Sequence, residues 1–123
     1  MKAVWVSLLV AAACARAPAR PAGLVVLHSR PVAGGYDLWL EPAAGARINA
    51  RLKPVLELPS GARLEFSAAG LTPDSAYFTE SPRVRFESAR ASVTGTLRVG
   101  ICPAGLNVCQ AVTLRIDQPL AGS

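Results

Sequence analysis

Short runs of alternating apolar and polar residues, separated by turn-forming residues, follow one another from Gly23 onward. The clearest run is 35–42, in which Tyr36, Leu38 and Leu40 alternate with residues of the opposite face. A period of two is typical of a half-buried β-strand, because successive side chains point to opposite faces of the sheet. The pattern predicts strands at 23–30, 35–42, 46–50, 53–61, 62–67, 82–88, 91–102 and 108–117.

These strands predict one domain over residues 23–119. We expect 46–50 to continue the strand 35–42 after a break, and we expect 68–81 to be a long loop because it is rich in turn formers. Beyond the first residues, no segment has a helical apolar period. The spacing indicates an all-β fold, an immunoglobulin-like antiparallel β-sandwich of about seven or eight short strands.

The last two predicted strands form a hairpin that carries two of the three cysteines, Cys102 and Cys109. Alternation places the apolar residues of both strands on one face, which must be the core face, and both cysteines on the other. In the register that matches the apolar faces, Cys102 lies opposite Cys109, and a shift by one residue would put core positions against solvent. This register also pairs Val99 with Val112, Leu97 with Leu114, Arg98 with Thr113 and Gly100 with Ala111.

A disulfide between Cys102 and Cys109 is easy in this register, because opposed Cα atoms of an antiparallel pair lie about 4.5–5.5 Å apart. The bond would close a short loop, and short loops remove less chain entropy than long ones. Gly100 and Ala111 are small and would leave the sulfur atoms accessible. These features favour a redox-active pair, with a structural staple as the alternative and a metal site as the third possibility.

The N-terminal segment 1–13 predicts an export signal. Lys2 precedes the largely apolar stretch 3–13, whose eleven residues suit a signal-peptide core and are too few to span a bilayer as a helix. Cys14 follows three alanines and resembles the lipidated cysteine of a bacterial lipobox. Ordinary cleavage after Ala13 or Ala15 is the alternative.

The odd number of cysteines bears on this choice. If Cys102 and Cys109 pair, lipidation accounts for Cys14. Residues 14–22 then form a Pro/Ala-rich tether that holds the domain at the membrane surface. We therefore expect an exported protein, in the periplasm or on the outer face of a bacterial membrane, where disulfides persist.

Composition and charge exclude some partners. The chain has 123 residues, of which 51% are hydrophobic and 17% charged, and this balance fits a globular core rather than a disordered chain. Its net charge is +5, but the arginines are scattered singly and no aromatic platform lies among them, so we expect no nucleic-acid binding. Arg98 and Arg115 are the cations expected to stabilise a cysteine thiolate.

Metal and hydrolytic chemistry lack the necessary residues. His28 is the only histidine, and Met1, the only methionine, lies in the predicted signal, so zinc and copper sites would be short of ligands. No nucleophile-elbow motif and no Gly-rich phosphate loop is present, and the acidic residues are scattered. We expect neither a bound metal nor a cofactor, and we expect His28 to be structural.

Two patches resemble the N-terminal, immunoglobulin-like domain of the DsbD-type thiol:disulfide interchange protein family. The stretch "GTLRVGICPAGLNVCQAVTLRIDQPL" (95–120) resembles the last, cysteine-bearing hairpin of that domain, and "RINARLKPVLELPSG" (47–61) resembles its Ile/Val-Asn segment and the following strand. The chain departs from the family pattern in three places. It has six residues between the cysteines, Gln110-Ala111 after the second cysteine, and Arg47 where many relatives carry His.

The resemblance implies that Cys102 and Cys109 exchange a disulfide with other envelope thiol-disulfide proteins. The partner would be a thioredoxin-like electron donor or acceptor. Cys109 matches the cysteine that forms mixed disulfides, and Cys102 matches the one that resolves them. The resemblance also implies a cap loop with an aromatic residue, for which Phe66, Tyr77 and Phe78 are the candidates. The resulting hypothesis is an exported thiol-disulfide exchange module. The alternative is a non-catalytic envelope lipoprotein with a structural hairpin disulfide.

Overall fold

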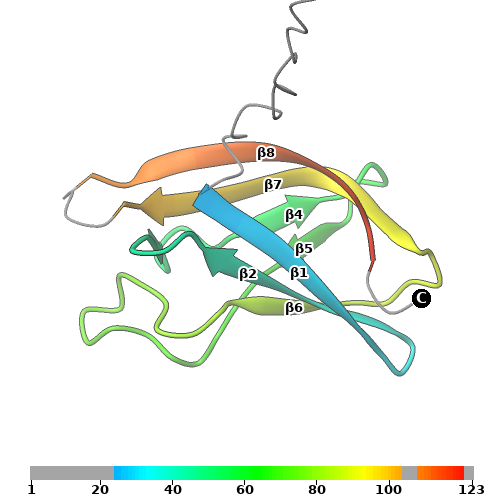
Figure 1. The fold of residues 1–123 in the computed structure, drawn as a ribbon, viewed down its shortest axis with the longest axis horizontal. Helices are drawn as coiled ribbons and strands as arrows, with labels where there is room; N and C mark the ends of the chain where they lie inside the picture. The colour runs from blue at the N-terminus through cyan, green and yellow to red at the C-terminus, as the bar shows by residue number, and fades with distance from the viewer. Residues whose placement is uncertain (1–23, 104–107, 121–123) are drawn as a thin grey trace, which may run out of the picture.

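The computed structural model describes residues 24–103 and 108–120 and arranges them in two antiparallel sheets (Figure 1). The described residues form β-strands and no helix, so the predicted all-β fold is confirmed. The strands are β1 (Val25–Val32), β2 (Gly35–Pro42), β3 (Arg47–Ile48), β4 (Val55–Glu57), β5 (Arg63–Glu65), β6 (Arg83–Phe86), β7 (Ser92–Cys102) and β8 (Gln110–Pro119).

The two sheets form a sandwich around a common core. One sheet has the strand order β1-β2-β6, and the other has the order β3-β7-β4-β5 with β8 also paired to β7. Strand β8 runs along one edge of β7, while β3 and β4 occupy successive parts of its other edge. Figure 1 shows β7 and β8 together along the top of the molecule and β6 at the bottom.

The core consists of the inward positions of both sheets. Leu38 and Leu40 of β2 are completely buried, as the alternation of 35–42 predicts. Burying a side chain of this kind contributes about 1.5–3 kcal/mol relative to leaving it exposed. The other fully or almost fully buried members include Ile48, Leu56, Phe66, Val93, Leu97, Val99 and Ile101.

The stretch 46–50 differs from its prediction. Arg47 and Ile48 pair with β7 in the other sheet and do not continue β2. A turn closed by the hydrogen bond from the Ala46 N–H to the Ala43 carbonyl, 2.9 Å long, redirects the chain between the two sheets. Gly45 in this turn has φ 80°, a conformation that glycine adopts without steric penalty.

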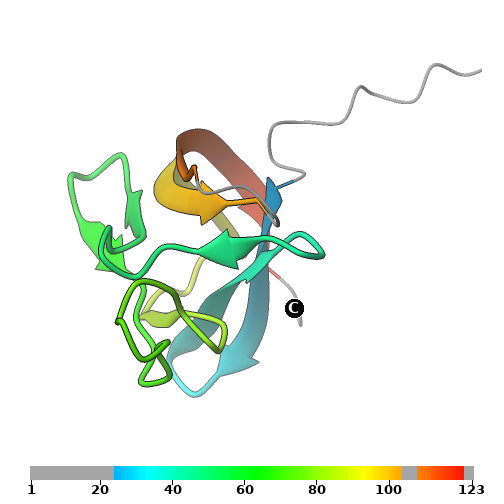
Figure 2. The same ribbon diagram turned by 90° about the vertical axis from the view of Figure 1, so that its left-hand side faces the viewer.

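The segment 68–81 is a loop, as predicted, and it lies beside β3. The Phe78 N–H donates a hydrogen bond of 3.1 Å to the Ile48 carbonyl, and Tyr77 forms an isolated antiparallel bridge with Asn49. Figure 2 shows this yellow-green loop next to the short strand β3. The loop is therefore bonded to one edge of β3, and the other edge of β3 pairs with the end of β7 that carries Cys102.

Some predictions fall outside the described residues. They concern the export segment 1–13, the lipidation candidate Cys14 and the tether 14–22. Residues 104–107, between the two cysteines, also lie outside the described residues. In the part of the chain that the structure describes, no helix has the length and apolar character needed to cross a membrane.

Candidate functional site

The β7–β8 hairpin has the predicted register. Pairing runs from Ser92 opposite Pro119 to Ile101 opposite Gln110. The next pair in this register is Cys102 and Cys109, which form a disulfide with Cα atoms 4.0 Å apart. The register follows from the apolar residues, since a slip by one residue would turn every core side chain toward solvent. The hairpin therefore has the predicted pairing, and the structure joins Cys102 to Cys109.

The two cysteines differ sharply in solvent exposure. Cys109 is exposed, whereas Cys102 is only 1% exposed. The Cys102 side chain lies on the face of β7 opposite the core, because its neighbour Ile101 points into the core. The face was predicted correctly, but the expectation that both sulfur atoms are accessible is wrong for Cys102.

A turn after β3 lies against this face of β7, at Gly100, two residues before Cys102. The Asn49 side-chain oxygen accepts hydrogen bonds from the backbone N–H groups of Arg51 and Leu52, at 2.8 and 3.1 Å. These bonds fold residues 49–52 into a turn of the Asx type. A Cβ added to Gly100 would lie 3.0 Å from the Asn49 Cβ and 3.6 Å from a Leu52 methyl carbon. Gly100 therefore lets the turn approach the face of β7 on which Cys102 lies.

A cation lies on the same face as Cys102. Arg47 is the residue directly opposite Cys102 in the β3–β7 pair, and opposed residues of a pair point to the same face. The guanidinium carbon of Arg47 lies 3.8 Å from the centre of the Tyr77 ring, in a cation–π contact. Loop 68–81 thus places an aromatic ring beneath the guanidinium of Arg47, along the edge of β3 that faces away from β7.

The two arginines that the sequence suggested lie farther from the cysteines. Arg98 shares the face of Cys102 but precedes it by four residues along β7, or about 13 Å at the rise of a strand. Its side chain forms an ion pair of 3.8 Å with Glu57. Arg115 pairs with Thr96, which lies still farther along the hairpin. Of these three arginines, Arg47 is therefore the one whose backbone lies next to Cys102.

The three candidate cap aromatics occupy different environments. Phe66 is completely buried in the core and cannot shield the disulfide. Phe78 is partly buried and packs against the same core. Tyr77 contacts Arg47 and bridges Asn49, so among these three it is the aromatic residue on the side of Cys102.

Hydrogen bonds around Asp74 hold the tip of this loop. The Thr72 hydroxyl donates to the Asp74 carboxylate at 2.6 Å, and the Ala76 N–H donates to it at 3.2 Å. These hydrogen bonds, that of Thr72 first, hold the pKa of Asp74 below its usual value of 3.8. The ionised carboxylate therefore stabilises the folded loop.

Asp74→Ala should lower stability at neutral pH more than in acid. Because the folded-state pKa is lowered, the contribution of Asp74 is present above the unfolded pKa of 3.8 and is lost as the pH falls through the folded pKa. Urea unfolding of the wild type and the variant, at neutral pH and well below the usual pKa of the carboxyl, measures this. A difference in stability that is the same at both pH values would contradict the assignment.

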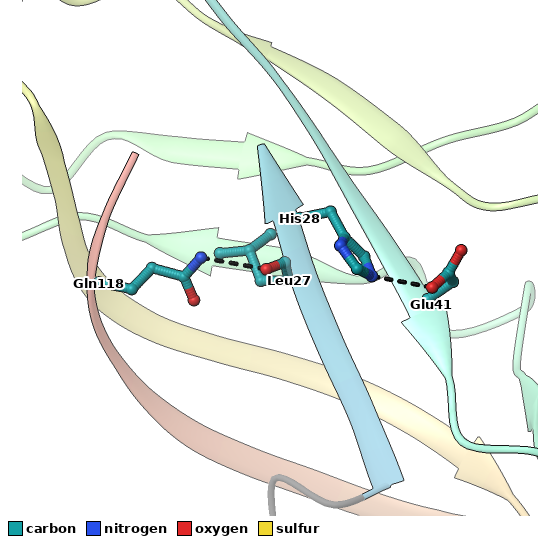
Figure 3. Close-up of polar contacts among 4 residues, drawn as sticks. All are labelled: Leu27, His28, Glu41 and Gln118. Carbon is teal, nitrogen blue, oxygen red and sulfur yellow. Dashed lines mark hydrogen bonds and ion pairs between the residues drawn. The ribbon is translucent and has the colours of Figure 1, made fainter. Parts of the chain in front are cut away.

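The single histidine lies on the other sheet. His28 Nε2 is 2.8 Å from Glu41 Oε2, and the imidazole stacks on Trp39 with ring centres 5.3 Å apart. Figure 3 shows the contact between His28 and Glu41. It also shows the hydrogen bond from the Gln118 side-chain amide to the Leu27 carbonyl, which links β8 to β1 and is 3.0 Å long. Among the described residues, no three His, Cys, Asp or Glu side chains are grouped to hold a metal ion.

Comparison of the chain with protein-family models, with curated proteins and with solved structures finds no match. The resemblance of residues 47–61 and 95–120 to the thiol:disulfide interchange family stays a prediction from the sequence. The function is therefore argued from the geometry of the disulfide and its surroundings.

Proposed function

We propose that the protein is an exported thiol-disulfide exchange module that passes electrons through Cys102 and Cys109 to or from other envelope thiol-disulfide proteins. The observation that carries the proposal is the unequal exposure of the two cysteines, 1% for Cys102 against an exposed Cys109. Exchange requires one sulfur that a partner can reach and a second thiol that resolves the mixed disulfide. The arrangement supports Cys109 as the first and Cys102 as the second.

The proposed reaction consists of two thiol-disulfide exchange steps that together transfer two electrons. When the module is reduced, a partner thiolate attacks the Cys109 sulfur, the bond to Cys102 breaks, and Cys102 leaves as a thiolate with the electron pair. The second thiolate of the partner then attacks the partner sulfur of the mixed disulfide and releases Cys109 as a thiolate. The partner gains a disulfide and the module gains two electrons. The reverse sequence oxidises the module.

An exposed apolar side chain beside Cys109 supports a protein as the partner. Val108, which directly precedes Cys109, is 66% exposed. Exposed apolar surface next to a reactive group is typical of protein contact sites. A thioredoxin-like donor or acceptor is the class of partner that we propose for this surface.

The proposed location is the periplasm or the outer face of a bacterial membrane, with lipidation at Cys14 as the anchor. The disulfide is compatible with an oxidising compartment of this kind.

Trapping of the mixed disulfide tests the function. In cells that express the full chain as Cys102→Ala, Cys109 should accumulate in disulfides with its partners, because the resolving thiol is missing. Acid quenching, alkylation and mass spectrometry of the non-reduced envelope fraction identify these partners. Cys109→Ala is the matched control, since it keeps only the buried thiol and should trap far less. A Cys102→Ala/Cys109→Ala double variant keeps Cys14 and corrects for any disulfide that Cys14 forms.

The alternative function has its own outcome. If Cys102→Ala traps no partner, and the double variant only loses about 2 kcal/mol of unfolding free energy, the disulfide is a structural staple. The protein would then be a non-catalytic β-sandwich of the envelope.

A further inference from the structure

One edge of strand β8 pairs with no strand in the described residues. The Leu120 N–H donates a hydrogen bond of 2.8 Å to the Ala91 carbonyl, one pair beyond the end of β8 in the same register. Backbone groups of successive strand residues point to alternate sides, so the even-numbered residues of β8 bond to β7. The odd-numbered residues therefore direct their backbone groups to the free edge, and those that carry both N–H and C=O are Ala111, Thr113, Arg115 and Asp117.

This free edge is accessible to another chain. The side chains of all four residues are exposed. Within residues 24–103 and 108–120, no hydrogen bond engages their backbone N–H and C=O groups. A row of unpaired backbone groups at the edge of a sheet is a template on which an extended segment can add as a further strand.

An apolar groove runs beside the free edge. It lies between β8 and β1, has a volume of about 630 Å³, and is lined in part by Leu97, Leu114 and Ile116. The hydrogen bond from Gln118 to Leu27 joins the two strands at the end of β8 that is far from Cys109 (Figure 3). In a strand added to β8, every second side chain points to the same face as Leu114 and Ile116. Apolar side chains at these positions would enter the groove.

The free edge also lies on the side from which Cys109 must be attacked. A thiolate attacks a disulfide in line, from the side opposite to the sulfur that leaves. The leaving sulfur belongs to Cys102 of β7, and the free edge is on the other side of β8. Cys109 is exposed and continues the alternation of the free-edge residues. A residue paired with it across this edge would have its Cα atom about 5.5 Å away, within the range of a disulfide.

Arg115 gives the free edge a preference for a negative charge. In the described part of the chain, no carboxylate forms an ion pair with Arg115, whereas Arg98 pairs with Glu57 at 3.8 Å. Opposite charges that face each other across two strands stabilise the pair. Arg115 follows Cys109 by six residues. In an added antiparallel strand, the residue opposite Arg115 therefore comes six positions before the residue opposite Cys109.

We infer that an extended segment of the exchange partner pairs antiparallel with the free edge of β8 and brings the partner's cysteine opposite Cys109. The segment carries an acidic residue six positions before this cysteine, opposite Arg115, and apolar residues at the alternate positions that face the groove. The partner's thiolate attacks the Cys109 sulfur, the bond to Cys102 breaks, and Cys102 leaves as a thiolate with the electron pair. The inference rests on the proposed exchange function and adds the way in which the partner docks.

A synthetic peptide tests the docking. The probe is Val-Glu-Val-Thr-Val-Thr-Gln-Cys with blocked ends, which sets its Glu opposite Arg115 when its cysteine is opposite Cys109. The control, Val-Val-Glu-Thr-Thr-Val-Gln-Cys, has the same composition but turns its Glu toward the groove. With the oxidised full chain carrying Cys14→Ser, acid quenching and mass spectrometry follow the mixed disulfide at Cys109. The probe should react about tenfold faster than the control, because docking raises the effective concentration of its thiol.

Methylation of single backbone nitrogens of the probe tests the strand pairing itself. The fourth residue of the probe lies opposite Thr113, so its N–H faces β8, and N-methylation there should reduce the rate to that of the control peptide. The fifth residue lies opposite Val112, and its N–H faces away from β8. N-methylation of the fifth residue is the matched control and should leave most of the rate advantage.

A charge reversal tests the role of Arg115. Arg115→Glu should slow the reaction of the probe and speed that of the same peptide with Lys in place of Glu, because the facing charges are then opposite again. Exchange with 2-mercaptoethanol, which is neutral and has no backbone to pair, should be the same in the variant and the wild type. An unchanged preference for the Glu peptide in the variant would overturn the assignment of Arg115.

The outcomes separate this inference from the function on which it rests. Equal rates for the probe and the control peptide overturn docking at the free edge, even if Cys102→Ala traps partners in cells. A faster probe together with no trapped partner upholds the docking edge and overturns exchange as the cellular function.

A second copy of the chain is the competing occupant of the free edge. Sedimentation of the oxidised chain should show a monomer. Thr113→Pro removes an N–H that faces the free edge and leaves the bonds between β7 and β8 in place, so it tests any dimer that forms. A dimer that this variant dissociates would overturn the inference, because the chain itself would then cover the edge.

Discussion

After reduction, Cys109 should react with iodoacetamide at least about tenfold faster than Cys102. Cys109 is exposed, whereas Cys102 is 1% exposed and the turn 49–52 lies against its strand. A reagent reaches a covered thiol only after local opening, and an opening free energy of about 1.4 kcal/mol already slows the reaction tenfold. Quenched time courses, followed by mass spectrometry of the two cysteine peptides, give both rates separately.

Two controls connect this ratio with the structure. Asn49→Ala removes the oxygen that accepts the N–H groups of Arg51 and Leu52, so it should speed alkylation of Cys102 and leave Cys109 unchanged. In concentrated urea the two cysteines should react at similar rates. Equal rates in the folded wild type would contradict the burial of Cys102 and remove the basis for giving the two cysteines different roles.

The hairpin was predictable because its signal is local and physically strong. A strand places alternate residues on opposite faces, so the apolar residues of β7 and β8 allow one register only, and that register sets Cys102 opposite Cys109. The prediction fails where pairing ends. Val108 was assigned to the core face by the same alternation, but it lies beyond the last paired residue of β8 and is 66% exposed.

The surroundings of the disulfide could not be predicted, because they come from distant parts of the chain. Alternation shows which side of β7 carries Cys102, but not that a turn about fifty residues earlier covers that side. Arg47 belongs to a strand of only two residues, too short to show a period, so its register against β7 has no sequence signal. The contact of Arg47 with Tyr77 depends in addition on the path of loop 68–81.

The cap candidates show the same limit. In the sequence, three aromatic residues follow the patch 47–61, namely Phe66, Tyr77 and Phe78, and no local pattern distinguishes one from another. In the structure, Phe66 follows β5, and its N–H donates a hydrogen bond of 2.9 Å to the Pro54 carbonyl, which fixes its backbone beside β4. Its ring is then enclosed between the sheets. Burial, and therefore role, follows from the strand beside which each residue lies and the face to which its side chain points.

Phe66→Ala should consequently lower the free energy of unfolding by about 3–5 kcal/mol, the usual loss for a buried Phe replaced by Ala. Such a loss is a large part of the stability of a typical domain, about 5–15 kcal/mol. Tyr77→Ala is the matched control: it removes a partly buried ring and a cation–π contact worth about 0.5–1 kcal/mol at an exposed site, so it should lower stability much less. Urea unfolding of both variants with the disulfide intact measures the difference. If Tyr77→Ala were the more destabilising change, Tyr77 rather than Phe66 would be the structural residue of the two.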